Sequence, residues 1–307
     1  MSLAPYVQIV ARGQGRARPM TLNEARAAMT LMLSGDAEPE AVGALLMVLR
    51  LRGEVPAEIA GFTAALRDHV HGTIPAADLD WPVYAAGRTR GVPLFLLSAR
   101  LVAQAGYKVS MHGWNAPAAL RDHLHLAGPS ITYSPLEDIA PAAFRLLKLR
   151  DTFGLRSCIN TVLRMWNPSG AAATVQGVFH PSYRSLQAEA AHLLGQTDLT
   201  IIKGGGGEFE RHPSKGVTLF GLRGGDHIAE DAPALLPVTR RLHEADDALD
   251  LGQIWQGHRT DSFATATVTG TAALALWTLR AAPTLPDAQT MADDLWDRRH
   301  QTEGLSA

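Results

Sequence analysis

Apolar side chains recur at helical spacing in the N-terminal quarter of the chain. Thr21 and Glu24 have the spacing of a capping box, so a helix is predicted to begin there, with Leu22 opening its apolar face. A second helix is predicted over residues 39–51, and Pro56 suits the first turn of a third. Short amphipathic helices of this kind predict a small all-helical lobe, assigned here to residues 1–75.

The pattern changes after this segment to short apolar runs that alternate with helical ones. Strands are predicted at residues 83–86, 108–111, 173–178, 200–203 and 217–220, and helices at 94–105, 141–149, 182–194 and 264–280. Such alternation is typical of an α/β fold with a mostly parallel sheet. We therefore predict a second, larger α/β domain over residues 76–307.

Composition narrows the class of protein. An apolar content of 46% and a charged content of 19% fit a soluble globular chain. Cys158 is the sole cysteine, which excludes an internal disulfide, and it lies in an apolar stretch as expected of inert core. Arg12, Arg16 and Arg18 precede no apolar leader segment, and no run reaches the roughly 18 apolar residues of a membrane span. We expect a cytoplasmic protein without a membrane partner.

Charge gives a mixed indication. A net charge of −2 argues against coating nucleic acid through bulk positive charge. The basic residues are nevertheless 24 Arg and only 4 Lys, and the planar guanidinium suits phosphate and carboxylate. A phosphate-binding surface and a GC-rich coding bias both account for this ratio.

Several segments carry a family resemblance. Residues 49–54 (LRLRGE) and 58–61 (EIAG) match the pattern LRxKGET…EIAG, and residues 149–157 match VRxxLGxRT. The match continues from Asn160 to Pro168, where the pattern is FNxLGPLxNP, and then through residues 177–179. In these segments the chain resembles the anthranilate phosphoribosyltransferase family, also called glycosyltransferase family 3. The resemblance implies the class-III nucleoside phosphorylase-like architecture and a homodimer formed through the helical lobe.

The resemblance also identifies where the family's substrate motifs fall. Members transfer phosphoribose from phosphoribosyl pyrophosphate to an amine, using the motifs GTGGD, NxST, KHGNR and a DE pair. Here these positions read YAAGR (84–88), LFLL (94–97), MHGWN (111–115) and FE (209–210). One glycine of the first motif remains, and its acidic residue is Arg88. A tyrosine, a leucine cluster and a reversed charge predict that the phosphoribosyl-pyrophosphate site is too altered for the family's reaction.

Other positions keep a possible substrate contact, while catalytic residues stay unassigned. The resemblance leaves His112, Gly113 and Asn115 as substrate-binding candidates, together with Arg150, Glu208 and Glu210. Arg150 aligns with the arginine that contacts the aromatic acceptor; the alternative is an ion pair with a carboxylate at a sheet end. Glu210 keeps the register of the DE pair, with Glu208 as a nearby substitute. Trp114 also lies where the family contacts substrate, whereas Ala140 replaces the histidine of the HPA motif.

A run of glycines follows one predicted strand. Gly204, Gly205, Gly206 and Gly207 come after Lys203, and their consecutive N–H groups could form an anion nest. It is not a Walker motif because no Lys-Ser/Thr follows, and a flexible turn is the alternative. His123 and His125 lack metal-ligand spacing, so no metal site is predicted. Asn160 and Asn167 are expected to bond backbone groups in turns.

Two functions remain open, and the first is favoured. The chain resembles a bacterial subfamily with similarly altered motifs that binds nucleic acid as a dimer. In that hypothesis a groove for DNA or RNA is lined by Arg88, Arg90, Lys203, Arg211 and Lys215. The alternative is a glycosyltransferase or phosphorylase acting on another pentosyl phosphate. It would need Glu208 or Glu210 facing a pocket, the glycine run as a phosphate cradle, and magnesium if it is catalytically active.

Overall fold

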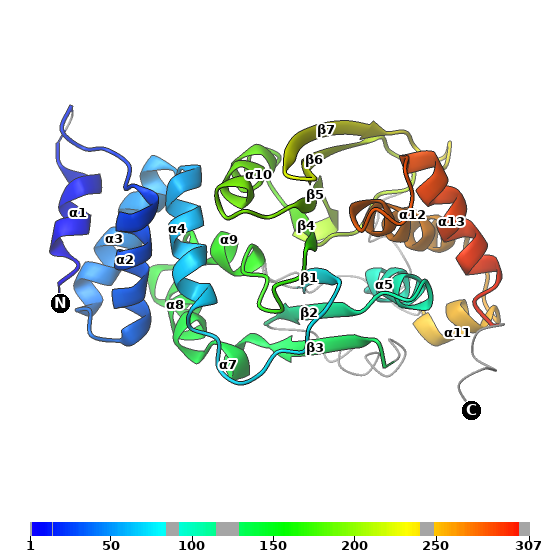
Figure 1. The fold of residues 1–307 in the computed structure, drawn as a ribbon, viewed down its shortest axis with the longest axis horizontal. Helices are drawn as coiled ribbons and strands as arrows, with labels where there is room; N and C mark the ends of the chain where they lie inside the picture. Colours follow the sequence, from blue (N-terminus) through cyan, green and yellow to red (C-terminus); the bar gives the residue numbers. More distant parts are fainter. Residues whose placement is uncertain (1, 14, 84–91, 115–128, 240–248, 301–307) are drawn as a thin grey trace.

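The computed structural model describes residues 2–13, 15–83, 92–114, 129–239 and 249–300. Helices at the N-terminal end form a separate lobe, at the left in Figure 1. They are α1 (Ala4–Ala11), α2 (Leu22–Ser34), α3 (Pro39–Arg52) and α4 (Pro56–Arg67). The predicted helical lobe is therefore confirmed, with α1 as an additional helix.

The start of α2 shows how the sequence determines this lobe. The Thr21 hydroxyl accepts a hydrogen bond from the Glu24 N–H, and the Glu24 carboxylate accepts one from the Thr21 N–H at 2.8 Å. Arg18 donates two further bonds of 2.7 Å to that carboxylate and holds the pKa of Glu24 at about 2. The helix ends at Gly35, whose φ of 83° lies in the left-handed region that favours glycine. The predicted capping box is confirmed.

A seven-stranded sheet forms the centre of the larger domain. Its order is β3-β2-β1-β4-β5-β6-β7. The strands are β1 (Leu79–Val83), β2 (Val109–Gly113), β3 (Ile131–Pro135), β4 (Ala173–Val178), β5 (Asp198–Lys203), β6 (Val217–Arg223) and β7 (Asp226–Ala232). Pairing is parallel from β3 to β5 and antiparallel for β6 and β7. The mostly parallel sheet that the alternating pattern predicted is thus confirmed.

Helices cover both faces of this sheet. Leu79, Trp81 and Met111 point to the face that packs on α5 (Phe95–Gln104), α12 (Ser262–Thr278) and α13 (Leu285–Asp297), with α11 (Leu251–Gln256) beside them. The opposite face packs on α9 (Ile159–Arg164) and α10 (Tyr183–Leu193), which separate the sheet from α4 in Figure 1. The helices α7 (Leu136–Ile139) and α8 (Pro141–Phe153) extend the helical core, since α8 contacts α2.

The strand β1 differs from its prediction. It spans Leu79–Val83, whereas residues 83–86 were predicted, and residues 84–86 lie outside the described part. The sequence does not indicate a strand at residues 79–82 because Asp80 and Pro82 are of residue types that are depleted in strands. Pro82 is tolerated here because the ladder with β4 has already ended at Asp80. Among the described residues, no helix is both long and apolar enough to cross a bilayer.

Candidate functional site: an arginine pocket between the lobes

The carboxyl ends of the parallel strands meet at one edge of the sheet. In open α/β sheets, ligands bind outside this edge. Here β2 ends at Gly113, β4 at Val178 and β5 at Lys203. The structure therefore places the sequence-predicted candidates of these strand ends at the edge where a ligand is expected.

His112 and Gly113 serve the packing of this edge. His112 is 2% exposed, its Nε2 lies 3.2 Å from Asp80 Oδ1, and its ring meets Trp166 edge-on. A Cβ at Gly113 would lie 1.7 Å from the Val83 carbonyl oxygen, so adjacent strands require glycine there. These contacts explain both residues without a substrate, while Asn115 lies outside the described residues.

The glycine run after β5 folds into a tight turn. The N–H of Gly204 donates to the Val178 carbonyl, that of Gly205 to Glu210, and that of Gly207 back to Gly204. A Cβ at Gly204 would lie 1.5 Å from the Glu208 carbonyl oxygen. The prediction of an anion nest is therefore wrong, and the alternative, a turn, is what the structure has. Three of the four N–H groups bond carbonyl groups of the protein because the chain folds back on itself.

The carboxylates that follow this turn are buried. Glu210 is 1% exposed, and its Oε2 accepts a hydrogen bond of 3.2 Å from the Phe95 N–H at the start of α5. Negative charge at this position stabilises a helix N-terminus. Trp81 packs against the rings of Phe95 and Phe209, at centroid distances of 6.4 and 5.4 Å. Protein groups therefore occupy the N-terminus of α5, which begins within the LFLL segment.

Arg211 does not join the basic groove that the sequence suggested. Its side chain is 3% exposed and lies on the α12 side of the sheet, where it donates to the Pro233 carbonyl. The reason is local, because the Arg211 N–H is bonded to Thr271 of α12. Lys203 and Lys215 are exposed, and Arg88 and Arg90 lie outside the described residues.

Arg150 does not form the ion pair with a sheet-end carboxylate that was the alternative prediction for it, and its predicted contact with an aromatic acceptor stays a prediction. Its guanidinium carbon lies 5.4 Å from the ring centroid of Trp114, a cation–π arrangement. Its nearest carboxylate, at 3.9 Å, belongs to its chain neighbour Asp151 on the same helix and not to a sheet end. Trp114 is itself 9% exposed and packs on Phe144 of α8.

A cavity of about 240 Å³ lies beside the end of β4. Arg50 reaches it from α3 of the helical lobe, Arg156 from the turn before α9, and Arg164 from the end of α9. Arg50 Nη1 donates to the Arg156 carbonyl at 2.7 Å, which joins the lobes at this point. We name this cavity, with its three arginines, the arginine pocket.

Arg164 is the buried member of the arginine pocket. It is 7% exposed, and within the described residues its side chain has neither a hydrogen bond nor an ion pair. Burial lowers the pKa of Arg164 despite the attraction of Glu208, and the neighbouring Arg156 lowers it further. A buried guanidinium without a bonded anion is costly, so this geometry suits an anionic ligand.

Aromatic side chains line one wall of the pocket, and one of them, Tyr183, bonds the half-buried carboxyl of Glu54. Tyr183 O–H donates to Glu54 at 3.2 Å, and burial raises the pKa of Glu54. Phe179 is 57% exposed, and its ring lies 4.9 Å from that of His180. Cys158 is buried behind this wall, and burial raises the pKa of its thiol well above the ordinary value.

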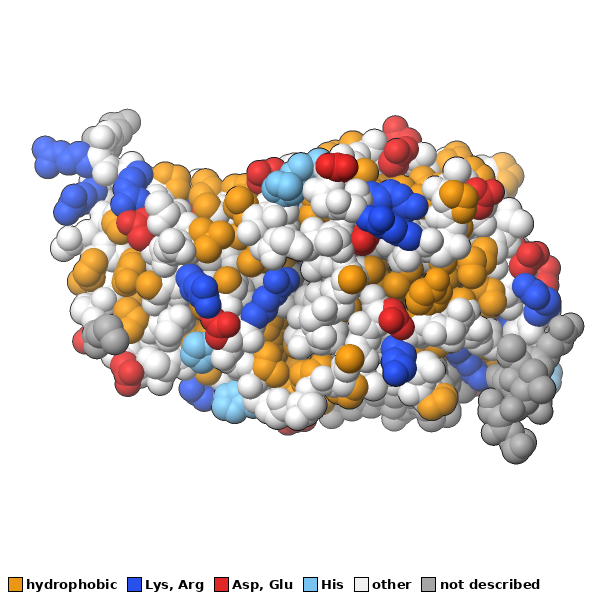
Figure 2. Space-filling view, viewed as in Figure 1, with side chains coloured by type: hydrophobic (Ala, Val, Ile, Leu, Met, Phe, Trp, Pro, Cys, Tyr) orange, Lys and Arg blue, Asp and Glu red, His pale blue; other side chains and the backbone are white. Residues whose placement is uncertain are grey.

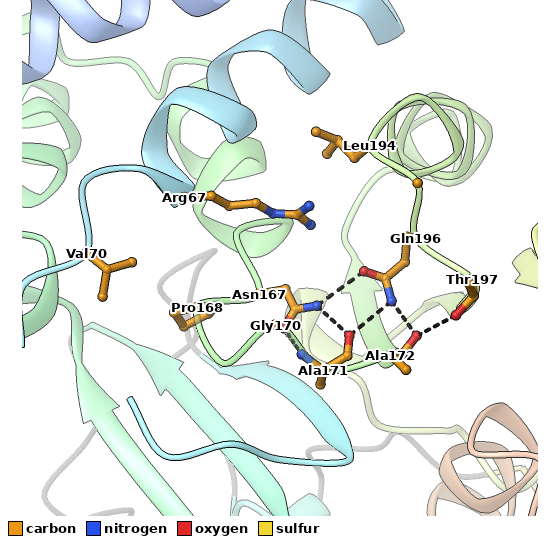
Figure 3. Close-up of a pocket in the computed structure, with 11 residues that line it drawn as sticks. Arg67, Val70, Asn167, Pro168, Gly170, Ala171, Ala172, Leu194, Gln196 and Thr197 are labelled. Carbon is orange, nitrogen blue, oxygen red and sulfur yellow. Dashed lines mark hydrogen bonds between the residues drawn. The ribbon is translucent and has the colours of Figure 1, made fainter. Parts of the chain in front are cut away.

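A second cavity, of about 420 Å³, lies at the opposite edge of the sheet (Figure 3). Its polar groups bond one another: Asn167 bonds both backbone groups of Ala171, and Gln196 bonds the Ala172 carbonyl. Asn167 thus closes a turn, as predicted, whereas Asn160 lies on α9. Because its amides are satisfied internally and it faces the amino ends of the strands, we do not assign a ligand to this cavity.

Sequence reasoning missed Arg164, although a signal was present. The pattern FNxLGPLxNP has Gly-Pro where this chain has Leu163 and Arg164. A charged residue in an otherwise apolar helix is unusual unless it has a partner. No three His, Cys, Asp or Glu side chains within the described ranges come together as a metal site.

Comparison with known proteins agrees with this fold. Residues 5–70 match the glycosyl transferase family, helical bundle domain. An anthranilate phosphoribosyltransferase of Rhizobium etli is 31% identical over 224 residues, which are 66% of this chain and 65% of that protein. One of Mesorhizobium japonicum is 28% identical over 67% of this chain. An uncharacterized protein of Aquifex aeolicus is 28% identical over 76% of this chain and 79% of its own length.

Solved structures extend the likeness to nearly the whole chain. Anthranilate phosphoribosyltransferase from Thermus thermophilus superposes with a TM-score of 0.76 at 21% identity, covering 96% of this chain and 94% of that one. The Saccharomyces cerevisiae enzyme in complex with PRPP and Mg gives 0.68 at 15% identity, with 96% and 93% covered. The fold is thus that of these transferases, and the chain is a homologue of anthranilate phosphoribosyltransferases. It spans just under two thirds of the Mesorhizobium and Rhizobium relatives, at 66% and 65%.

Proposed function

We propose that this chain is a binding protein on a phosphoribosyltransferase-like scaffold, which takes a phosphate-bearing ligand in the arginine pocket and does not transfer phosphoribose. The observation that carries the proposal is Arg164, buried to 7% exposure without a bonded anion and facing the same cavity as Arg50 and Arg156. A phosphate oxygen would compensate that charge, and planar guanidinium groups suit it.

The second half of the proposal concerns the lost reaction. Phosphoribosyl pyrophosphate needs glycines, hydroxyls and magnesium-binding carboxylates. Leu94, Phe95, Leu96 and Leu97 are at most 3% exposed here, and Glu210 bonds the N–H of Phe95. An anionic donor beside Glu210 would meet like charge. These features support a donor site unable to hold magnesium pyrophosphate.

Calorimetry with inorganic phosphate, ribose 5-phosphate and phosphoribosyl pyrophosphate with magnesium tests both halves. We expect binding of the phosphate compounds and no release of pyrophosphate in the presence of anthranilate. Turnover of the activated donor would overturn the second half and leave the active glycosyltransferase or phosphorylase as the function.

The decisive variant is Arg164→Met, with Arg298→Met, at the exposed residue that follows α13, as its matched control. Loss of charge-assisted hydrogen bonds should weaken phosphate binding at least about tenfold in R164M and leave it unchanged in R298M. The melting temperature of R164M should hold or rise, because an apolar residue of similar size replaces an uncompensated charge. An unchanged affinity together with a lower melting temperature would make Arg164 a structural residue.

Nucleic acid bound by a homodimer is a second candidate. Lys203 pairs in register with Val178, which lines the arginine pocket, and the exposed ring of Phe179 follows directly. Cations beside an exposed aromatic ring are what single-stranded nucleic acid requires. On the face in Figure 2, however, basic, acidic and uncharged side chains are interspersed, and no continuous basic stripe crosses it.

The affinity for a labelled single-stranded oligonucleotide, measured over a series of salt concentrations, tests the nucleic-acid candidate. Binding through the phosphate backbone should fall by about 0.7 log units in affinity per log unit of salt for each phosphate neutralised. Phe179→Ala should weaken binding of the oligonucleotide but not of inorganic phosphate. Light scattering of the same samples measures whether the chain is a dimer. Oligonucleotide affinity that is insensitive to salt would reject this candidate.

A further inference from the structure

A cavity of about 530 Å³ lies on the other side of the sheet from the arginine pocket. One wall comes from the segment after β7, another from α12 and a third from the start of α13. Most lining groups are apolar, among them Leu235, Leu274, Trp277 and Leu285. The volume and the apolar walls are those of a small-molecule site.

Arg211 supplies the polar group of this cavity. It is 3% exposed, and the local backbone makes room for it: a Cβ on Gly270 of α12 would lie 3.1 Å from Arg211 Cδ. Its Nη2 donates to the Pro233 carbonyl at 2.5 Å, its Nη1 to Gln289 at 3.5 Å, and its Nε has no bonded partner. A guanidinium is thus held in place by neutral acceptors only.

No carboxylate within the described part of the chain pairs with Arg211. Burial alone lowers the pKa of Arg211 to about 10, so the side chain is charged at neutral pH. Glu230 and Asp231 line the cavity but are exposed and lie at its rim. A buried cation that meets only neutral groups is expected to take an anion from outside.

The rim and the walls restrict which anion fits. Arg223 is charged but only half-buried, and its Nη1 and Nη2 donate to the carbonyls of Trp277 and Ala282 while its guanidinium stacks on the Trp277 ring. The rim carboxylates disfavour a dianion such as phosphate. A single negative charge with an apolar body complements one buried guanidinium and hydrophobic walls.

We propose that this cavity is a second ligand site, specific for small monocarboxylic acids with an apolar body. The carboxylate bonds Arg211, and the body packs on Leu274, Trp277 and Leu285. The site is independent of the arginine pocket, since α12 and α9 cover opposite faces of the sheet.

Ligand-detected NMR and calorimetry with benzoate and with its neutral isostere benzamide test the proposal on the full chain. We expect benzoate to bind at least about tenfold more tightly than benzamide, from the charge-assisted bond to Arg211. Arg211→Met should abolish this preference for benzoate. Leu285→Trp, which fills the cavity and leaves the guanidinium in place, should weaken both ligands.

Each outcome decides for or against the site. Benzoate that does not bind, or that binds equally to the wild type and to L285W, would overturn the proposal even if R211M fails to fold. Arg164→Met should leave benzoate binding unchanged, so failure here is separable from failure of the phosphate proposal. Equal binding of benzoate and benzamide would also overturn it, because Arg211 would then play no part.

Discussion

At the scale of single residues, the informative feature is a charge without its counter-charge. Arg164 and Arg211 are both nine-tenths buried, yet neither meets a bonded carboxylate within the described residues. Such groups are rare in cores because desolvation penalises the charged form. The sequence can indicate a charge in an apolar segment, as at Arg164, but not whether that charge has a partner, since the partner depends on tertiary contacts and not on neighbours in the chain.

Glu54 gives a pH dependence that can be measured. Burial raises its pKa, so the folded state favours the protonated carboxyl, and its contribution to stability is complete below the ordinary value of about 4.3. That contribution is lost as the pH rises through the raised value. In Glu54→Gln the free energy of unfolding should therefore depend less on pH between the ordinary and the raised pKa of Glu54. Denaturant titrations of the wild type and the variant across this pH interval measure the free energy of unfolding. Parallel pH profiles of the two proteins would contradict the prediction.

The same residue should affect ligand binding. When ionised, Glu54 offsets part of the positive field of the neighbouring Arg50. Removing that negative charge should strengthen phosphate binding in E54Q at neutral pH, by a factor of a few. Calorimetry at two ionic strengths measures the phosphate affinity of E54Q and of the wild type. Glu40→Gln, at the exposed start of α3, is the control.

At the scale of elements, periodicity predicted most of the scaffold. The helices α2 and α3, the strand β4 and the capping box follow directly from spacing and cap residues. The edge strand β7 could not be predicted because five of its seven residues are exposed and several are acidic. β1 was misplaced because its proline and aspartate oppose strand propensity.

The glycine turn offers a test at this scale. Gly204→Ala should cost about 3 kcal/mol or more, because the added Cβ meets the Glu208 carbonyl oxygen at 1.5 Å and the backbone must move. Gly216→Ala is the matched control: its Cβ would lie 3.7 Å from the Ala232 carbonyl, so the cost should stay within about 0.5 kcal/mol. Thermal denaturation gives the melting temperatures of the two variants. Equal melting temperatures would contradict the close packing of Gly204 on the Glu208 carbonyl.

At the scale of the whole molecule, the candidate site depends on two lobes at once. Arg50 comes from the helical lobe, and Arg156 and Arg164 from the α/β domain. The resemblance predicted this architecture but placed the site at the motifs of the family's donor. The arginine pocket was not predicted because Arg50 lies more than 100 residues before the other two arginines in sequence, as the Arg50–Arg156 bond shows.

The affinity for a ligand that contacts both lobes should fall when a pocket arginine of either lobe is replaced. Arg50→Met should weaken phosphate binding about tenfold, although the residue lies outside the α/β domain. Arg26→Met, another exposed arginine of the helical lobe, should have no effect. In wild type, phosphate at a hundred times its dissociation constant should add about 2.7 kcal/mol to the free energy of unfolding. Differential scanning calorimetry measures that gain, and its absence would place phosphate elsewhere.

The sole cysteine has a practical consequence for measuring the distance between the two lobes. Cys158 is buried with a raised thiol pKa, so it is a poor target for maleimides and spin labels. A cysteine-free background is then unnecessary, and one new surface thiol on α3 with another on α10 would carry a dye pair or two nitroxides. The distance between the two labels then reports the separation of the lobes in solution, with and without phosphate.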